Sequence, residues 1–290
     1  MSRVHDALRR AEQAGLISTG APQKPGEIPS RLEGSGGNGA PARPAAVSLN
    51  IHRELLAQVQ EGEFRPARES HLLDLNASHE TPAEEFRTLR TRLNHLQTLQ
   101  PLHTIVVTSP SPAEGKTFTA VNLALAQSHL TEGSVMLGDF DLRRPIIHNL
   151  FQIERSPGLS DYLAGQCTFA QSMRRISGMN LYVLPAGTPV KNPLELLNMR
   201  TAKALFEELP RIFTWAIFDT PPLLFSADAN LLATLADGTI LVVKVGATTF
   251  DNVTRAMQSL CENNVLGIVA NGARASELYS KYTYYYSRSE

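Results

Sequence analysis

Short apolar runs alternate with helical stretches over the C-terminal two-thirds of the chain. Several of these runs are continuous rather than alternating, which is typical of strands whose two faces are both covered by helices. We predict strands at residues 105–107, 135–137, 181–184, 216–218, 240–243 and 265–269. Because helical stretches separate most of these runs, the pattern predicts an α/β fold with a largely parallel sheet and helices on both faces.

A helix is predicted immediately before the first of these strands. Thr81 can cap it, Pro82 suits the first helical position, and Glu84 completes a capping box. Apolar residues then recur at steps of three and four up to the break before Pro101, and they form one stripe: Phe86, Leu89, Leu93, Leu96 and Leu99. A second helical stretch follows the first strand, at residues 118–130.

The N-terminal part of the chain has a different character. Segment 1–17 contains a short amphipathic pattern at residues 4–16, which predicts a helix. A helix of this length is only marginally stable in isolation. Fourteen of the 29 residues at 18–46 are Gly, Pro or Ser, so we predict a flexible linker over 18–49. Segment 50–80 has no clear hydrophobic period and is predicted as a connecting segment of uncertain structure. The main domain is predicted at 81–275 and a separate tail at 276–290.

Composition and charge narrow the class of protein. The 290 residues are 42% apolar, enough for a sizeable core, and the formal charge of -1 provides no basic field for nucleic acid. The two cysteines, Cys167 and Cys261, favour a reducing compartment, and the eight histidines lack metal-ligand spacing. No apolar run reaches the roughly 20 residues of a membrane span, and no secretory signal is evident. We therefore expect a cytoplasmic protein.

The segment after the first predicted strand is a candidate nucleotide loop. It reads SPSPAEGKT over residues 109–117 and leads into the second helical stretch. Such loops turn backbone N–H groups toward phosphate at a helix N-terminus, with a lysine on the terminal phosphates and a hydroxyl on magnesium. Lys116 and Thr117 suit those two roles. Pro110 stands where the usual pattern has its first glycine, and a plain strand-to-helix turn is the alternative.

Carboxylates follow two of the other predicted strands. Asp139 and Asp141 come after the run at 135–137, and Asp219 follows the run at 216–218. Ligands of open parallel sheets bind outside the carboxyl ends of the strands, so these acids could converge beside the loop. Each Asp taken singly is equally a helix cap or turn former. Together with Lys116, they predict a magnesium-nucleotide site.

Three motifs in this order resemble those of the bacterial tyrosine kinases that regulate capsule and exopolysaccharide synthesis. They are EGKT at 114–117, DFDLRRP at 139–145 and FDTPP at 218–222. The segments 181–187 and 192–197 and a tyrosine-rich C-terminus also look like this family. The resemblance covers roughly residues 80–290 and implies a P-loop NTPase-like fold and an ATP-dependent protein-tyrosine kinase.

The resemblance also implies roles for individual residues. ATP and Mg²⁺ are the implied cofactors. Asp139 is the implied base for the tyrosine hydroxyl, with Lys116 and Asp141 as further catalytic residues, and the implied metal ligands are Thr117, Asp141 and Asp219. The implied nucleotide-binding residues are Ser111, Ala113, Glu114, Gly115, Lys116, Thr117, Phe118 and Asn271. The pair Asn271-Gly272 is equally a turn.

Five of the seven tyrosines of the chain lie in its last dozen residues. In the family such tail tyrosines are phosphorylated by a neighbouring subunit. The candidate phosphoacceptors are Tyr279, Tyr282, Tyr284, Tyr285 and Tyr286. Adjacent aromatics on a polar terminal segment have no periodicity that would bury them, whereas a mobile tail can deliver hydroxyls to an active site. A sticky edge strand or a partner-docking tail is the alternative.

Glu84, Arg87 and Arg90 resemble the family's E-x-x-R-x-x-R signature for assembly. Their spacing forms an inclined row on the predicted helix, which could face a neighbouring subunit of a ring-like homo-oligomer. Ordinary solvated side chains are the alternative. The resemblance further implies a separate transmembrane activator of the polysaccharide co-polymerase type, a tyrosine phosphatase as a further partner, and a location at the inner face of the membrane through the activator.

Some residues depart from the family pattern and keep rival functions open. Ala113 stands where many relatives have glycine, and Gly138 interrupts the apolar run before Asp139. Partitioning ATPases of this fold carry an early loop lysine where this chain has Ser111, which argues against an ATPase switch. An inactive nucleotide-binding scaffold is the second rival. Arg143 and Arg144 could contact either phosphate or a neighbouring acid.

Overall fold

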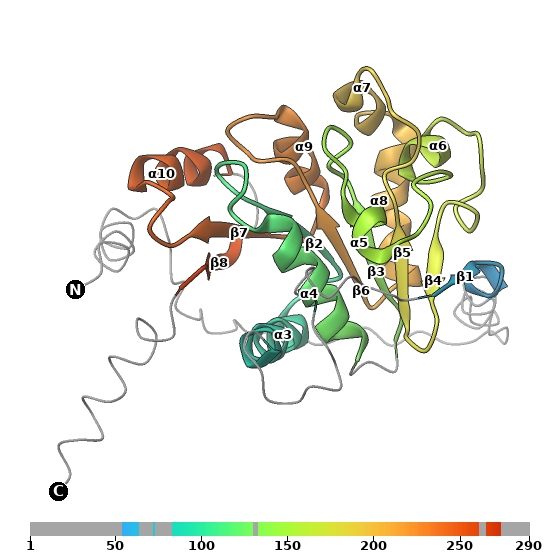
Figure 1. Ribbon diagram of the computed structural model, residues 1–290, viewed down its shortest axis with the longest axis horizontal. Helices are drawn as coiled ribbons and strands as arrows, with labels where there is room; N and C mark the ends of the chain where they lie inside the picture. The colour runs from blue at the N-terminus through green and yellow to red at the C-terminus, as the bar shows by residue number, and fades with distance from the viewer. Residues whose placement is uncertain (1–53, 64–71, 73–82, 130–132, 261–264, 274–290) are drawn as a thin grey trace, which may run out of the picture. The chain divides into compact units, whose positions relative to one another are not determined.

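One mixed sheet of eight strands organises the described part of the chain in the computed structural model (Figure 1). The structure describes residues 54–63, 72, 83–129, 133–260 and 265–273, all within one compact unit. The strand order is β1-β4-β5-β3-β6-β2-β7-β8, and every neighbouring pair is parallel except β4 and β5. The strands are β1 Gln60–Gly62, β2 Thr104–Thr108, β3 Val135–Asp139, β4 Arg174–Ile176, β5 Leu181–Leu184, β6 Trp215–Asp219, β7 Gly238–Lys244 and β8 Val265–Asn271.

Helices cover both faces of the sheet. The α3 and α4 helices lie on one face (Figure 1), where Ile105 and Val107 of β2 point. Val106, between them, points to the opposite core, which α8 and α9 help to form. This alternation explains why the central strands are apolar throughout. The helices are α3 Ala83–Leu99, α4 Lys116–Ser128, α5 Ile147–Phe151, α6 Leu159–Leu163, α7 Pro193–Leu197, α8 Arg200–Ile212, α9 Ala227–Leu235 and α10 Phe250–Ser259.

The predicted α/β class with a largely parallel sheet is confirmed. All six predicted strands are present, and their ends lie within two residues of the prediction. The short strands β1 and β4 were not predicted, and β1 joins the sheet well ahead of the expected domain start at residue 81. The second helical stretch begins at Lys116 rather than 118 and ends at Ser128 rather than 130.

The helix before β2 follows its predicted apolar stripe over most of its length. Phe86 and Leu93 are buried, and Leu89 and Leu96 pack against the same core. Leu99 was wrongly placed in the stripe, because it is 69% exposed in the last turn. The proposed cap of this helix, Thr81-Pro82, lies outside the described residues, as do segments 1–17, 18–49 and 276–290 and Cys261. No helix in the described ranges combines the length and apolarity of a membrane span.

Candidate functional site

A tight loop joins β2 to α4 at the carboxyl edge of the sheet. Gly115, which precedes α4, has a φ of 99°, and Ala113 has a φ of 62°. Both angles are left-handed, a conformation that glycine adopts freely and that costs an alanine on the order of 1 kcal/mol. Ala113 therefore occupies the glycine-like conformation of the loop at an energetic cost, and the surrounding contacts must hold it there.

The Glu114 side chain provides one of those contacts. Its carboxylate is buried, with 4% of the residue exposed. One oxygen, Oε2, accepts a hydrogen bond from the Ser111 N–H at 3.0 Å, and Oε1 accepts one from Thr248 Oγ1 at 2.7 Å. The Glu114 carbonyl accepts a third bond from Asn271 Nδ2 at 2.9 Å. The Glu114 side chain thus holds the loop, and its two carboxylate oxygens are used for this contact.

The Asn271 amide packs closely against the backbone at Gly115. A Cβ atom at position 115 would come within 1.9 Å of Asn271 Nδ2, so the turn requires glycine for space as well as for its φ. The bond to Glu114 gives Asn271 a role in supporting the loop. Its implied role in nucleotide binding stays a prediction.

The structure brings Lys116, Thr117 and the three aspartates together. Asp139 and Asp219 are paired in register at the ends of β3 and β6. Lys116 Nζ donates to Asp141 Oδ2 at 2.9 Å and to Asp219 Oδ1 at 3.3 Å. Thr117 Oγ1 donates to Asp219 Oδ2 at 2.6 Å. The first turn of α4 thereby faces carboxylates from two neighbouring strands.

These acids carry more negative charge than the lysine offsets. Burial raises the pKa of Asp219 to about 6, with Asp141 adding to the effect, even though Lys116 and Thr117 oppose it. Burial and the charge of Asp219 also raise the pKa of Asp139 well above its usual range. Burial lowers the pKa of Lys116, but Asp219 and Asp141 outweigh it, so its net pKa is raised and it stays charged. The site thus favours an additional positive charge.

The donor atoms suit a magnesium ion that also binds substrate phosphates. The chemistry is all oxygen, and Asp139 Oδ1 is buried without a hydrogen-bond partner among the described residues. The part of the chain that the structure describes contains no cluster of three or more His, Cys, Asp or Glu arranged to hold a metal without further ligands. Mg²⁺ prefers oxygen ligands, retains waters and is often held by one or two carboxylates together with phosphate. The site fits that mode rather than a complete protein cage.

The buried charge of Asp219 predicts a stability cost that depends on pH. At pH 7.5 the change Asp219→Asn is expected to raise the free energy of unfolding of the nucleotide-free protein by about 2 kcal/mol. The folded pKa is raised above the unfolded value, so the folded state binds this proton more tightly and the wild type loses stability as pH rises from about 4 to about 6. Urea unfolding at pH 4.5 and 7.5 tests this expectation.

The difference in stability between Asp219→Asn and the wild type should shrink at the lower pH, because Asp219 is then largely neutral in the folded protein. A difference of the same size at both pH values would contradict the raised pKa. Comparing the two proteins at each pH cancels the titration of all other groups.

The Arg143 side chain binds a neighbouring acid. Its Nε and NH2 groups contact the two carboxylate oxygens of Asp228 at 2.8 and 3.1 Å, and Asp228 is fully buried at the start of α9. The pair connects the segment after Asp139 with the segment after Asp219. Arg144 donates its backbone N–H to Asp141 Oδ1 at 3.0 Å, while its side chain is exposed. The structure thus shows the contact of Arg143 with a neighbouring acid, and a contact with phosphate stays a prediction.

The three residues expected at an oligomer contact lie on α3. Glu84 and Arg87 form an ion pair with each other on the surface of the helix. Arg90 is half-buried and donates NH1 to the Ala126 carbonyl at 2.9 Å, near the C-terminal end of α4, where a cation is favoured. Arg90 therefore already supports the α3–α4 packing, whereas Glu84 is the most exposed of the three.

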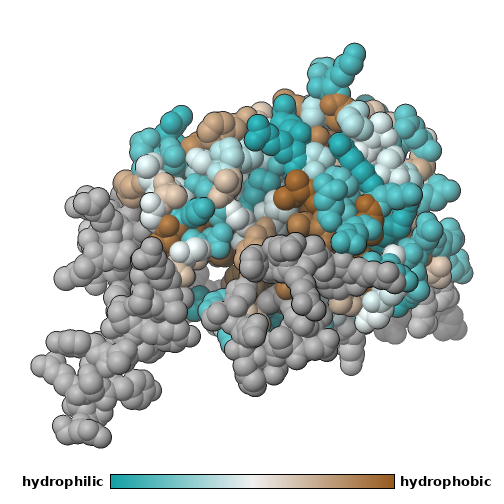
Figure 2. Space-filling model, viewed as in Figure 1, coloured by the Kyte–Doolittle hydropathy of each residue, from teal (hydrophilic) through white to brown (hydrophobic). Residues whose placement is uncertain are grey.

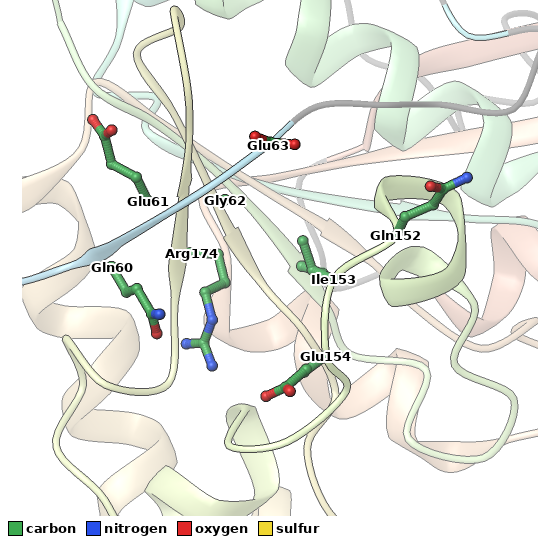
Figure 3. Close-up of a pocket in the computed structure, with 8 residues that line it drawn as sticks. All are labelled: Gln60, Glu61, Gly62, Glu63, Gln152, Ile153, Glu154 and Arg174. Atoms are coloured by element: carbon green, nitrogen blue, oxygen red, sulfur yellow. The ribbon is translucent and has the colours of Figure 1, made fainter.

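The Phe118 ring and the cavity of Figure 3 are separate from the cluster of Lys116, Thr117 and the three aspartates. The Phe118 ring packs edge-on against Phe86 of α3 at a centroid distance of 5.8 Å, so only its backbone is available to the loop.

The cavity has a volume of about 280 Å³ and is lined by β1, the start of β4 and residues 152–154 (Figure 3). None of the predicted nucleotide or metal residues lines it, so it is a separate feature at the far edge of the sheet.

The fold, the loop at the start of α4 and the acids at the strand ends define a P-loop NTPase. Among solved structures, the kinase domain of Escherichia coli tyrosine kinase ETK matches with a TM-score of 0.64 and 31% identity, covering 70% of this chain and 80% of that one. The septum site-determining protein MinD of Pyrococcus horikoshii matches with a TM-score of 0.50 at 19% identity over 60% of this chain and 72% of that one, which shows the fold alone.

Sequence relatives give the family. Tyrosine-protein kinase YwqD of Bacillus subtilis is 35% identical over 205 residues, which are 70% of this chain and 86% of YwqD. Tyrosine-protein kinase etk of E. coli K12 is 34% identical over 207 residues, 69% of this chain but only 28% of that protein. No family model matches the chain. By its likeness to YwqD and to the ETK kinase domain, the chain belongs to the bacterial tyrosine kinases and is a protein-tyrosine kinase.

Proposed function

We propose that this kinase transfers the γ-phosphoryl group of ATP to the tail tyrosines of a neighbouring copy and thereby regulates exopolysaccharide or capsule synthesis and export. The observation that carries the proposal is the position of Lys116, which bridges Asp141 and Asp219 at the first turn of α4. The proposed acceptors are Tyr279, Tyr282, Tyr284, Tyr285 and Tyr286.

Phosphoryl transfer depends mainly on positioning and on neutralising charge. The backbone N–H groups of the loop, including those of Ala113, Gly115 and Thr117, would bind the phosphates at the N-terminus of α4. Lys116 would exchange its present carboxylate partners for the terminal phosphates. Because its raised pKa keeps it charged, the lysine can neutralise the phosphate oxygens at any physiological pH.

Mg²⁺ would be held by the Thr117 hydroxyl and by Asp141 and Asp219, directly or through water. When bound, the ion supplies charge neutralisation on the phosphate oxygens. The two carboxylates are already grouped around Thr117 and Lys116, so little reorganisation of the protein is needed to form this set.

Asp139 is proposed to accept the proton of the incoming tyrosine hydroxyl. Burial and the charge of Asp219 raise the pKa of Asp139 well above its usual range, which makes its carboxylate a stronger base than that of an ordinary aspartate. Its Oδ2 accepts the Ile147 N–H at 3.0 Å, which fixes the carboxyl group, and Oδ1 is left to receive the proton.

We further propose a ring-like homo-oligomer and an association with a transmembrane activator at the inner face of the membrane. The support for both is the resemblance of the motifs to the family. Glu84 is exposed on α3, so this part of the signature can be reached by a neighbour. A tyrosine phosphatase would reverse the modification.

A mixing experiment tests transfer between subunits. One protein carries Lys116→Met and an intact tail, and the other has an intact nucleotide site with its five tail tyrosines changed to phenylalanine. Each protein alone should incorporate no phosphate after incubation with Mg-ATP. Mixed together, they should place phosphate on the Lys116→Met chain, which intact-protein mass spectrometry distinguishes from its partner.

Two results would contradict this proposal. Phosphate on the tail-substituted chain when it is alone would place the acceptors elsewhere in the protein. No phosphate in the mixture, although the wild type is phosphorylated under the same conditions, would show that transfer occurs within one chain.

A further inference from the structure

The turn between β7 and α10 contacts the nucleotide loop through a side-chain hydrogen bond. Thr248 lies in this turn, 134 residues after Glu114 in the sequence, and its hydroxyl donates to Glu114 Oε1 at 2.7 Å. The same hydroxyl oxygen accepts the Lys244 N–H at 2.8 Å. Since a hydroxyl has a single proton, these two contacts fix its direction, with Lys244 as donor and Glu114 as acceptor.

The chain of bonds continues into the loop. The other carboxylate oxygen of Glu114 accepts the Ser111 N–H at 3.0 Å. An unbroken path therefore runs from the end of β7 through Thr248 and Glu114 to the backbone of the loop. Its central group is a buried carboxylate, and hydrogen bonds to a buried charge are stronger than those between neutral groups.

The loop needs an external support of this kind. Ala113 is held at a φ of 62°, which an alanine adopts only at an energetic cost. A phosphate site of inward N–H groups works only while these groups point to a common centre. Releasing Glu114 would let the backbone around Ala113 relax toward ordinary angles and would disperse the N–H groups.

We propose that Thr248 is a positioning residue for nucleotide binding, which acts through Glu114 to hold the loop in its phosphate-binding shape. This inference rests on the proposed binding of ATP at the loop. It assigns a function to a residue that belongs to none of the three motifs and that lies on a different strand connection from the acids.

The test compares Thr248→Val with Thr248→Ser in the full chain. Valine keeps the shape of the side chain and removes the hydroxyl, whereas serine keeps the hydroxyl. We expect the Kd for Mg-ATP, measured by fluorescence titration with a labelled ATP analogue, to rise about tenfold in Thr248→Val and to stay within about twofold in Thr248→Ser. The KM for ATP should rise in parallel, with kcat nearly unchanged.

Thr249→Val is the matched control. Thr249 is the N-cap of α10, and its hydroxyl serves the helix by accepting the Asn252 N–H at 3.2 Å. Its loss should lower the thermal midpoint, as loss of a cap does, and leave the Kd unchanged. A second set of variants uses the Glu114→Ala background, where Thr248→Val should have no additional effect on the Kd.

Each outcome is decisive. A Kd within twofold of the wild type in Thr248→Val would overturn the role of Thr248. It would also be overturned if Thr248→Val raised the Kd by the same factor in the Glu114→Ala background as in the wild type. If Thr248→Val does not fold, Thr248→Ala removes the same hydroxyl and takes its place in the comparison. A wild type that binds no Mg-ATP would overturn the proposed function itself, which separates that failure from a failure of the inference.

Discussion

Changing Lys116 to methionine is expected to reduce tyrosine phosphorylation about 1000-fold, which is the largest effect expected of a single side chain here. The ammonium group is the cation that contacts both Asp141 and Asp219, and methionine has a similar length without the charge. The two buried carboxylates would then lack its compensation, and the terminal phosphates would lose it as well. Initial rates of phosphate incorporation from labelled ATP measure the effect.

Lys203→Met is the matched control for this change. Lys203 lies exposed on α8, and it is not part of the site. Its substitution should leave the rate within about twofold of the wild type, as surface changes commonly do. A Lys116→Met protein that retains more than a tenth of the wild-type rate would show that the chemistry takes place elsewhere.

The second large effect is expected at Gly115. Its change to alanine combines a φ of 99° with a new Cβ only 1.9 Å from Asn271 Nδ2, so either the loop or the amide has to move. Movement of the amide breaks its bond to the Glu114 carbonyl, and movement of the loop misplaces its N–H groups. We expect the affinity for Mg-ATP to fall about 100-fold. Fluorescence titration of the folded variant provides the measurement.

Gly165→Ala separates the two causes of this effect. Gly165 has a φ of 73°, but nothing lies within 4 Å of the Cβ atom that an alanine would add. This control therefore has the backbone strain without the collision, and it should lose some stability while binding nucleotide normally. The double change Gly115→Ala with Asn271→Ala should recover part of the affinity. If removing the Asn271 side chain recovered none of it, the collision would not be the cause.

The sequence predicts the centre of the fold better than its edge. The central strands are apolar on both faces because α3 and α4 cover one side and α8 and α9 the other, so each strand appears as a continuous apolar run. The edge strands β1 and β4 have three residues each, reading QEG and RRI. Such short polar segments carry no period, and their pairing with each other depends on contacts between distant parts of the chain.

Some contacts of the candidate site could likewise be predicted from the sequence, and others could not. The grouping of Lys116 with Asp141 and Asp219 could be predicted, because the carboxyl ends of parallel strands share one edge of the sheet. The contacts of Thr248 and Asn271 with Glu114 could not, because they join polar residues of ordinary turns across more than 130 positions. Such contacts are set by the tertiary structure and leave no local pattern.

Intact-protein mass measured after incubation of the 290-residue chain with Mg-ATP tests the central claim most directly. We predict stepwise addition of phosphate to the wild type, with the modified residues mapped to the tail tyrosines at positions 279–286 and with no addition to Lys116→Met or in Mg-ADP. Phosphate on Lys116→Met, or a wild type that hydrolyses ATP without gaining phosphate, would contradict a tyrosine autokinase that works through this loop.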